Sequence, residues 1–284
     1  MGGPAPPDNG LNIRVLNLSL GTDSVQSYSL DPLMYVAEVA CRQGIAVVVA
    51  AGNQGTTRGR LDNPAADPFL LAVGASDTLS TADLKDDQVA EFSSRGNNIR
   101  NPDLVAPGRS VASLRAPGSY NDTNYPAAVV ADRFFRGSGS SQAAAVVSGA
   151  AALLLQQRPT LTPDQLKALL TTSARPLTGF TATARGAGSL DLVKAEKTAT
   201  TTATQRFTAA TGAGSLEAAR GTGHLSDGTV ELHGEQDIFG VAFDSRSWAA
   251  KSLAGTSWTG GAFNGSTWTG TTWSGRMWST GLHS

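Results

Sequence analysis

The sequence contains few of the residues that form cross-links and no segment built to cross a membrane. One cysteine, Cys41, occurs among 284 residues, which excludes an internal disulfide and any metal cluster built from cysteines. Cys41 lies in a helical pattern and is expected to pack in a core. No apolar run reaches membrane-spanning length. Residues 1–7 lack the basic and apolar regions of a signal peptide, so none is expected there.

The sequence also has few histidines and a net charge close to zero. The only histidines are His224, His233 and His283, and each is expected to be an isolated surface residue. The formal net charge is −1 and no basic stripe occurs, which argues against nucleic acid as a partner. No acidic cluster has the ligand spacing of a calcium site. The sequence therefore predicts neither a metal site nor a cofactor.

The most informative stretch of the chain is residues 136–149, where small residues surround a group of serines. Gly137 and Gly139 permit a tight turn, and the apolar run that follows predicts a buried helix. Ser140 or Ser141 then lies at the helix start, where free N–H groups and the helix dipole favour negative charge. A serine at that position is either a helix cap or a nucleophile.

An earlier part of the chain predicts a strand–helix–strand unit. Residues 15–21 form a short apolar segment closed by Gly21, typical of a buried strand, and Asp31-Pro32 predicts a helix start. The apolar run 45–51 suits a central parallel strand. Since ligands gather at the carboxyl ends of parallel strands, Gly21 and Asn53 are expected at the same sheet edge. Residues 50–55 are equally compatible with an ordinary strand-ending turn.

These segments resemble the motifs of the subtilisin-like serine proteases. Gly139, Ser140, Ser141 and Ala143 match the family's Gly-Thr-Ser-Met-Ala pattern, with Ser140 in place of Thr and Gln142 in place of Met. Ala145 stands where the family has Pro. Residues 50–55 match its Ala-Ala-Gly-Asn-x-Gly segment. Further matches follow in the family's order, at residues 63–66, 71–75, 92–96, 102–108 and 186–191. The resemblance therefore covers residues 11–196.

The resemblance implies a three-layer α/β fold with a parallel sheet, and a serine endopeptidase that acts on polypeptides. It implies that Ser141 is the nucleophile, and that Asn53 and the Ser141 N–H hold the oxyanion. The substrate pocket would be flanked by backbone of six residues, which are Ser19, Leu20, Gly21, Ala50, Ala51 and Gly52. It also implies an extracellular location.

Two motifs of the family are missing from the sequence. The Asp-Thr-Gly and His-Gly-Thr-His segments precede the substrate strand in the family, whereas here that strand begins at about Val15 and no histidine occurs before His224. The chain is therefore expected to be the C-terminal part of such a protease, inactive alone, with the N-terminal half of the peptidase domain as a possible partner. The alternative is a pseudoprotease or binding module.

Composition divides the chain into four expected parts: 1–196 from the peptidase domain, a Thr/Ala linker at 197–213, a short β-rich segment at 214–246 with strands at 228–233 and 238–243, and a tail at 247–284. Large apolar residues recur every five positions in the tail, and these are Trp248, Leu253, Trp258, Phe263, Trp268, Trp273 and Trp278. The repeat predicts a stacking array that binds glycan or cell wall, covers the protease domain, or stays disordered.

Overall fold

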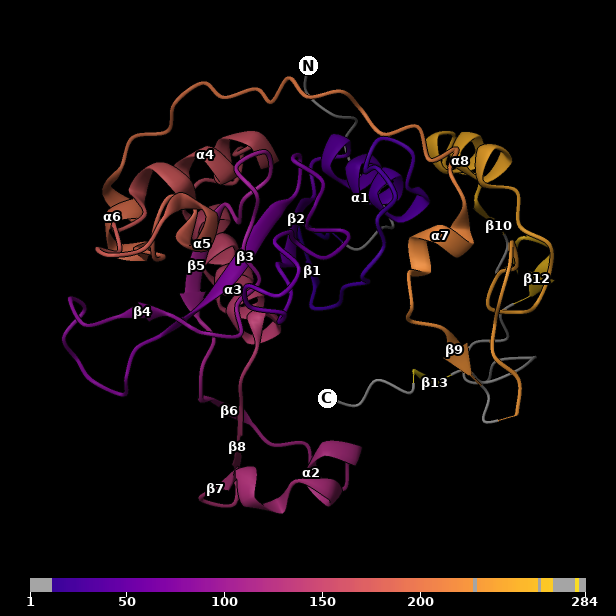
Figure 1. Cartoon of the computed structure of the whole chain (residues 1–284). Helices are drawn as coiled ribbons and strands as arrows, with labels where there is room; N and C mark the ends of the chain where they lie inside the picture. The colour runs from indigo at the N-terminus through magenta and orange to yellow at the C-terminus, as the bar shows by residue number, and fades with distance from the viewer. Residues whose placement is uncertain (1–11, 227–228, 260–261, 268–278, 281–284) are drawn as a thin grey trace. The chain divides into compact units, whose positions relative to one another are not determined.

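The computed structural model describes residues 12–226, 229–259, 262–267 and 279–280 (Figure 1). The chain divides into two compact units, Met1–Gly21 with Gly44–Gln205, and Thr22–Gln43 with Arg206–Ser284. This division differs from the expected four parts, because residues 22–43 group with the C-terminal residues rather than with the sheet that flanks them in the sequence. The boundaries drawn from composition remain a prediction.

A five-stranded, mostly parallel sheet forms the centre of the first unit. β1 (Val15–Leu18), β2 (Ala46–Ala50) and β3 (Leu71–Asp77) lie side by side in parallel, and β5 (Leu104–Pro107) pairs with β3 in the same direction. β4 (Gln88–Val89) adds an antiparallel pair at the end of β3. All residues of β2 are buried, which confirms the central parallel strand predicted from its continuous apolar run.

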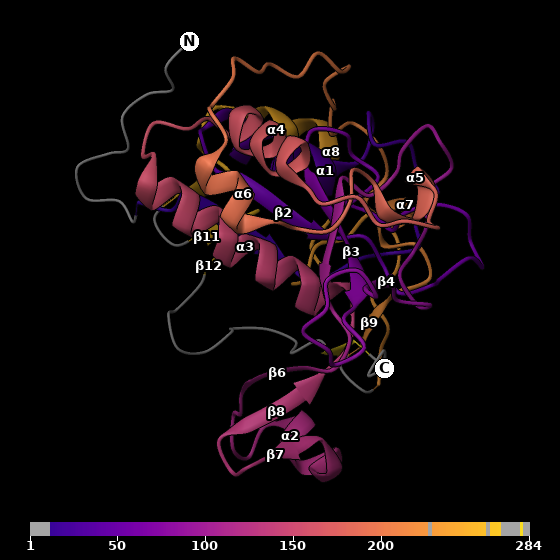
Figure 2. The same ribbon diagram turned by 90° about the vertical axis from the view of Figure 1, so that its left-hand side faces the viewer.

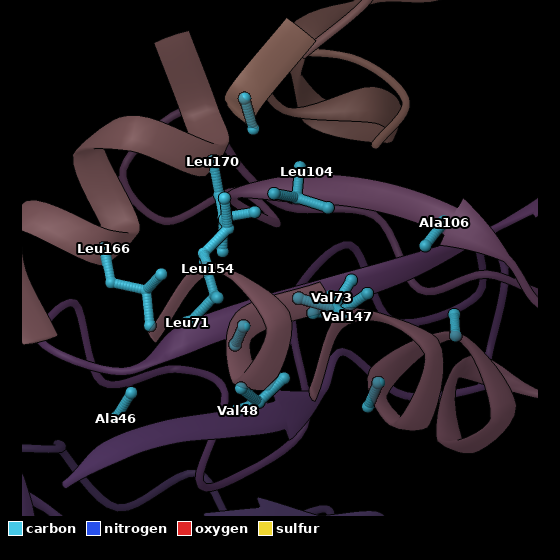
Figure 3. Packing of buried hydrophobic residues seen from close by; sticks show 14 of the residues in the cluster. Ala46, Val48, Leu71, Val73, Leu104, Ala106, Val147, Leu154, Leu166 and Leu170 are labelled. Atoms are coloured by element: carbon cyan, nitrogen blue, oxygen red, sulfur yellow. The ribbon is translucent and has the colours of Figure 1, made fainter. Parts of the chain in front are cut away.

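Two helices cover one face of this sheet. α3 (Ser140–Gln157) and α4 (Pro163–Ser173) bring Val147, Leu154 and Leu170 against strand residues such as Val48 and Leu104 (Figure 3). The start of α4 is fixed by the predicted capping box, in which Thr162 and Gln165 each accept from the other's backbone N–H. The short helices α5 (Ala182–Arg185) and α6 (Leu192–Lys197) follow. The unit is thus an α/β fold.

β1 is an edge strand of this sheet, since no described strand pairs with its outer side. Leu16 within it is 36% exposed and Leu20 beyond it is 50% exposed. The sequence pattern predicted a buried strand here, and that prediction is wrong, because none of the four residues of β1 is buried. An apolar strand with unpaired N–H and C=O groups is a surface on which another strand can pair.

An arm that the sequence did not predict separates β5 from α3. β6 (Val111–Leu114), β7 (Val129–Val130) and β8 (Phe134–Gly137) form a separate antiparallel sheet beside the short helices α2 (Tyr120–Asn124) and η1 (Pro126–Ala128), as Figure 2 shows. The base of the arm is closed by a hydrogen bond of 2.8 Å from the N–H of Gly139 to the carbonyl oxygen of Gly108. The arm therefore leaves and returns at the serine turn.

The second unit is organised around α1 (Pro32–Arg42). The predicted start is confirmed, because Asp31 caps the helix by accepting from the N–H groups of Leu33 and Met34. α1 packs against α7 (Leu216–Arg220) and α8 (Ser245–Leu253). The buried Glu38 accepts from the N–H of Ala210 at 2.8 Å. Part of the expected linker is therefore packed onto α1.

The rest of the second unit contains little regular structure among the described residues. β9 (Leu225–Ser226) pairs with β13 (Ser279–Thr280), and the strands expected at 228–233 and 238–243 give only the isolated bridges Ser226↔Glu231 and Gln236↔Ala242. None of the helices in the described part of the chain is both long and apolar enough to cross a lipid bilayer.

The apolar residues that repeat every five positions in the tail lie in different kinds of secondary structure. Trp248 lies in α8, while β10 (Trp258–Thr259), β11 (Ala262–Phe263) and β12 (Ser266–Thr267) form a small antiparallel sheet. The rings of Trp248 and Phe263 both pack on Phe243, with centroids 5.5 and 6.5 Å from its ring. Trp268, Trp273 and Trp278 lie outside the described residues. Within the described part, two of the repeated rings thus contribute to one aromatic cluster.

Candidate active site

The turn before α3 presents the serines in three different environments. The hydroxyl of Ser138 accepts from the N–H of Ser110 at 2.9 Å. Ser140 is fully buried. Ser141 is partly exposed, and its Oγ donates to the carbonyl oxygen of Ser19 at 3.3 Å, while the Ser19 hydroxyl donates back to the carbonyl oxygen of Ser141 at 2.9 Å. Ser141 is therefore the accessible hydroxyl at the helix start.

Glycine at position 139 allows the chain to enter α3 without a side-chain cap. Its φ is +157°, and a Cβ there would lie 2.8 Å from Gln142 Oε1. Because the N-cap residue Gly139 has no side chain to accept from the first turn, the N–H of Ser141 has no partner among the described residues. This N–H is available to an oxygen that carries negative charge.

The carboxyl end of β2 places Asn53 beside the same turn. Gly52 has φ +108°, and a Cβ at this position would lie 2.4 Å from Oδ2 of the buried Asp62 and 2.7 Å from the Oγ of the buried Ser94. The close approach of these side chains requires glycine. The turn after Gly52 then directs Asn53 toward α3.

The amide of Asn53 has a fixed orientation. Its Oδ1 accepts from the N–H of Ser140 at 2.8 Å and from the Ser140 hydroxyl at 3.0 Å, and this hydroxyl in turn accepts from the N–H of Gly52 at 3.1 Å. The Nδ2 group therefore points away from Ser140 and has no hydrogen-bond partner among the described residues. Asn53 Nδ2 lies 3.5 Å from where a Cβ on Gly139 would stand, so this donor is close to the serine turn.

The six residues expected at the substrate pocket differ in accessibility. Ser19, Leu20 and Gly21 are exposed at the carboxyl end of β1. Ala50, Ala51 and Gly52 are buried at the end of β2. The backbone of Ala51 is already used, since its N–H donates to Val73 and its carbonyl oxygen accepts from Asp62. The segment after β1 is therefore the more accessible of the two.

The site also contains contacts that the sequence did not indicate. The Ser148 hydroxyl donates to Asn17 Oδ1 at 3.1 Å, and Asn17 Nδ2 donates to the Ser19 hydroxyl at 2.9 Å. Asn17 thus links α3 to the end of β1. Side chains two residues apart on a strand point to the same side. This spacing is the only sequence signal that could have grouped Asn17 with Ser19.

Among the described residues of the first unit, no side chain offers Ser141 a proton acceptor. The partner of its Oγ is the carbonyl oxygen of Ser19, which is not a base. His224 and His233 belong to the other compact unit, and His283 lies outside the described residues. The described part of the first unit therefore brings together a hydroxyl and two free N–H donors, and it contains no imidazole.

Comparisons with known proteins show the family to which the chain is related. The family model described as the Subtilase family matches residues 9–214. Serine protease AprX of Bacillus subtilis (strain 168) is 39% identical over 163 residues, which cover 56% of this chain and 37% of AprX. Subtilisin E of the same organism is 34% identical over 115 residues, which cover 40% of this chain and 26% of that protein.

A solved structure shows the same similarity in three dimensions. The crystal structure of fervidolysin from Fervidobacterium pennivorans, a keratinolytic enzyme related to subtilisin, has a TM-score of 0.52 and 27% sequence identity, and the match covers 72% of this chain and 28% of fervidolysin. The chain thus spans between 26% and 37% of the lengths of these three relatives.

Proposed function

Because the chain belongs to the subtilase family of serine proteases, we propose that it contributes the nucleophile of an endopeptidase, and that this nucleophile is Ser141. One observation carries the proposal: of the serines in the turn, Ser141 alone combines an accessible hydroxyl with a free N–H at a helix start. Its Oγ would attack a peptide carbonyl carbon while its proton passes to a base. The base would return that proton to the departing amine as the peptide C–N bond breaks, which leaves an acyl-enzyme.

We further propose that Asn53 Nδ2 and the N–H of Ser141 hold the oxyanion that forms in this attack. The support is the fixed orientation of Asn53, whose Oδ1 is held by Ser140 and whose donor is left free. Donors fixed before the reaction stabilise the developing charge without reorganisation. Polypeptide backbone would lie along Ser19, Leu20 and Gly21.

Labelling with a fluorophosphonate tests the choice of nucleophile. In the protein assembled with a segment that carries the family's Asp and His motifs, the probe should modify Ser141, as read by peptide mass spectrometry, and Ser141→Ala should remove the label. Ser138→Ala serves as the matched control and should label like the parent. A label on Ser138 or Ser140 would contradict the assignment.

Replacing Asn53 by alanine should slow turnover while leaving substrate binding nearly unchanged. The expected loss in kcat is about 10²–10³-fold, a magnitude taken from the loss of such a donor in subtilisin itself. The reason is that the donor acts on the charged intermediate and not on the ground-state carbonyl. Steady-state kinetics of the assembled protein measure both parameters. A rise in KM with unchanged kcat would assign Asn53 to substrate binding instead.

A non-catalytic function is the second candidate, as a pseudoprotease or as a binding module that acts through the tail on glycan, cell wall or protein. The observation that favours it is that no described side chain of the first unit offers Ser141 a base. Gln142, in the place of the family's Met, also lies against the turn, where a Cβ on Gly137 would be 2.7 Å from its Nε2. Absence of any label in a folded, assembled protein would favour this candidate. As part of the protease proposal, we also propose that the protein acts outside the cell.

A further inference from the structure

Two histidines and a glutamate of the second unit gather around a single carboxylate oxygen. Oε1 of Glu217, in α7, is 2.9 Å from Nε2 of His224 and 3.5 Å from Nδ1 of His233. The three donor atoms all lie within 4.8 Å of one another, and the two imidazole centroids are 4.1 Å apart. The residues expected to be isolated surface histidines therefore form a cluster.

The spacing of the three donor atoms is close to that of a zinc site. Ligand atoms about 2.0–2.1 Å from a tetrahedral zinc ion lie about 3.3–3.4 Å from one another. The two distances from Glu217 Oε1, 2.9 and 3.5 Å, bracket this value, and the distance between the two imidazole nitrogens is within 4.8 Å. Side-chain adjustments can then bring all three donors to one ion.

The carboxylate of Glu217 is held with one oxygen facing the imidazoles. Its Oε2 accepts from Arg220 Nη1 at 2.8 Å and from the N–H of Gly234 at 2.9 Å, which leaves Oε1 for His224 and His233. Of the two carboxylate oxygens, Oε1 is therefore the one placed to bind an ion together with the imidazoles.

The ring of His233 has the second contact that metal-binding histidines usually make. Its Nε2 lies 3.0 Å from Oε2 of Glu231, on the side of the ring away from Glu217. A carboxylate there holds the proton on Nε2 and leaves the lone pair on Nδ1, which faces the cluster. The contact with Glu231 therefore orients His233 as a metal ligand. A simple hydrogen bond between His233 and Glu217 would not need this second carboxylate.

We propose that Glu217, His224 and His233 bind one zinc ion on the second unit. Two imidazole nitrogens and one carboxylate oxygen suit zinc, whereas calcium and magnesium take oxygen ligands. His233 is 56% exposed, so an ion can enter and water can fill the fourth position. The ion would link α7 to the segment around His233, in a region with little regular structure, and would stabilise the second unit.

Calorimetric titration of the full chain with zinc chloride tests the proposal, with protein that carries no polyhistidine tag. We expect one zinc ion per chain and a higher melting temperature of the second unit. Glu231→Gln should weaken binding by about 10–100-fold, the usual cost of losing such a supporting carboxylate. His224→Ala and His233→Ala should each weaken it further. Cobalt should give the visible absorption of a tetrahedral site in the parent and not in these two variants.

Glu235→Gln is the matched control for the loss of a nearby carboxylate. Glu235 accepts from the Ser215 hydroxyl and from the N–H groups of Leu216 and Glu217, but from no imidazole. Because glutamine keeps an acceptor oxygen for these donors, this variant should bind zinc like the parent. Circular dichroism checks that each variant is folded, and Glu217→Gln, which keeps the shape of the side chain, provides a second test of the carboxylate. Failure of the parent to bind zinc saturably, or undiminished binding by folded His224→Ala and His233→Ala, would overturn the proposal.

Discussion

A polypeptide that carries the family's Asp and His motifs should raise the reactivity of Ser141 by up to about 10⁶-fold when it assembles with this chain, a magnitude known for the triad of subtilisin itself. Without a base, the serine hydroxyl is a weak nucleophile, and Ser141 Oγ donates to the carbonyl oxygen of Ser19 rather than to a basic side chain of the described first unit. The exposed outer side of β1 provides a place where the added segment can extend the sheet.

The measurement compares peptide hydrolysis by the chain alone, by the assembled pair, and by a pair in which the added histidine is replaced by alanine. The last pair is the matched control, because it should assemble equally well and remain slow. Robust hydrolysis by the chain alone that Ser141→Ala abolishes would show that no added base is needed. A stable assembled pair without activity would favour the pseudoprotease.

The second large effect is on stability: we expect Asp103→Ala to lower the free energy of unfolding by about 3–5 kcal/mol. Asp103 lies directly before β5, and its Oδ2 accepts from the N–H of Ala72 at 2.7 Å. Arg100 Nη1 and Lys167 Nζ lie 3.0 and 3.2 Å from its Oδ1, and all three charged side chains are at most 15% exposed. Removing the carboxylate leaves two poorly hydrated cations facing each other.

Urea unfolding near neutral pH measures this loss. Asp103→Asn separates the loss of charge from the loss of the hydrogen bond, since its amide oxygen still accepts from Ala72 but carries no charge. We expect the free energy of unfolding of this variant to lie between those of Asp103→Ala and the parent. Asp86→Ala, on an exposed loop, is the control and should change stability by less than about 0.5 kcal/mol. Equal stability of parent and Asp103→Ala would refute the importance of this network.

The same carboxylate predicts a pH dependence. Burial raises the pKa of Asp103, but Arg100 and Lys167 outweigh it and keep the pKa below its ordinary value of 3.8. A carboxyl whose pKa is lower in the folded state contributes stability that is present above the unfolded value and is lost as the pH falls through the folded value. The difference in stability between the parent and Asp103→Asn should therefore shrink below about pH 4.

Local signals in the sequence predicted the parts of the molecule that depend on neighbouring residues. The apolar run of β2, the glycine turn before α3 and the cap at Asp31 were each readable from a few consecutive residues. The family resemblance then supplied the relation between distant segments, which composition and periodicity alone do not contain. The roles of Ser141 and Asn53 stay predictions until they are measured.

Features that depend on distant contacts were missed. The grouping of α1 with α7 and α8 rests on contacts such as that of Glu38 with Ala210, which no local pattern announces. The cluster of Glu217, His224 and His233 likewise forms only when the chain after α7 turns back on itself. The arm between β5 and α3 carries no strong periodicity, and its short strands gave no signal.

The contacts that orient Asn53 and Ser141 have a consequence for how the protein folds. Asn53 and Ser140 are 87 residues apart in the chain, and Ser19 and Ser141 are 122 residues apart. Contacts of such high sequence separation require large loops to close, which is slow and costs entropy before the contact forms. Asn53 and the serine turn should consequently come together late in folding, when the parallel sheet is already in place. A partly folded chain, as it emerges during synthesis, would then carry the serine without the surroundings that make it reactive.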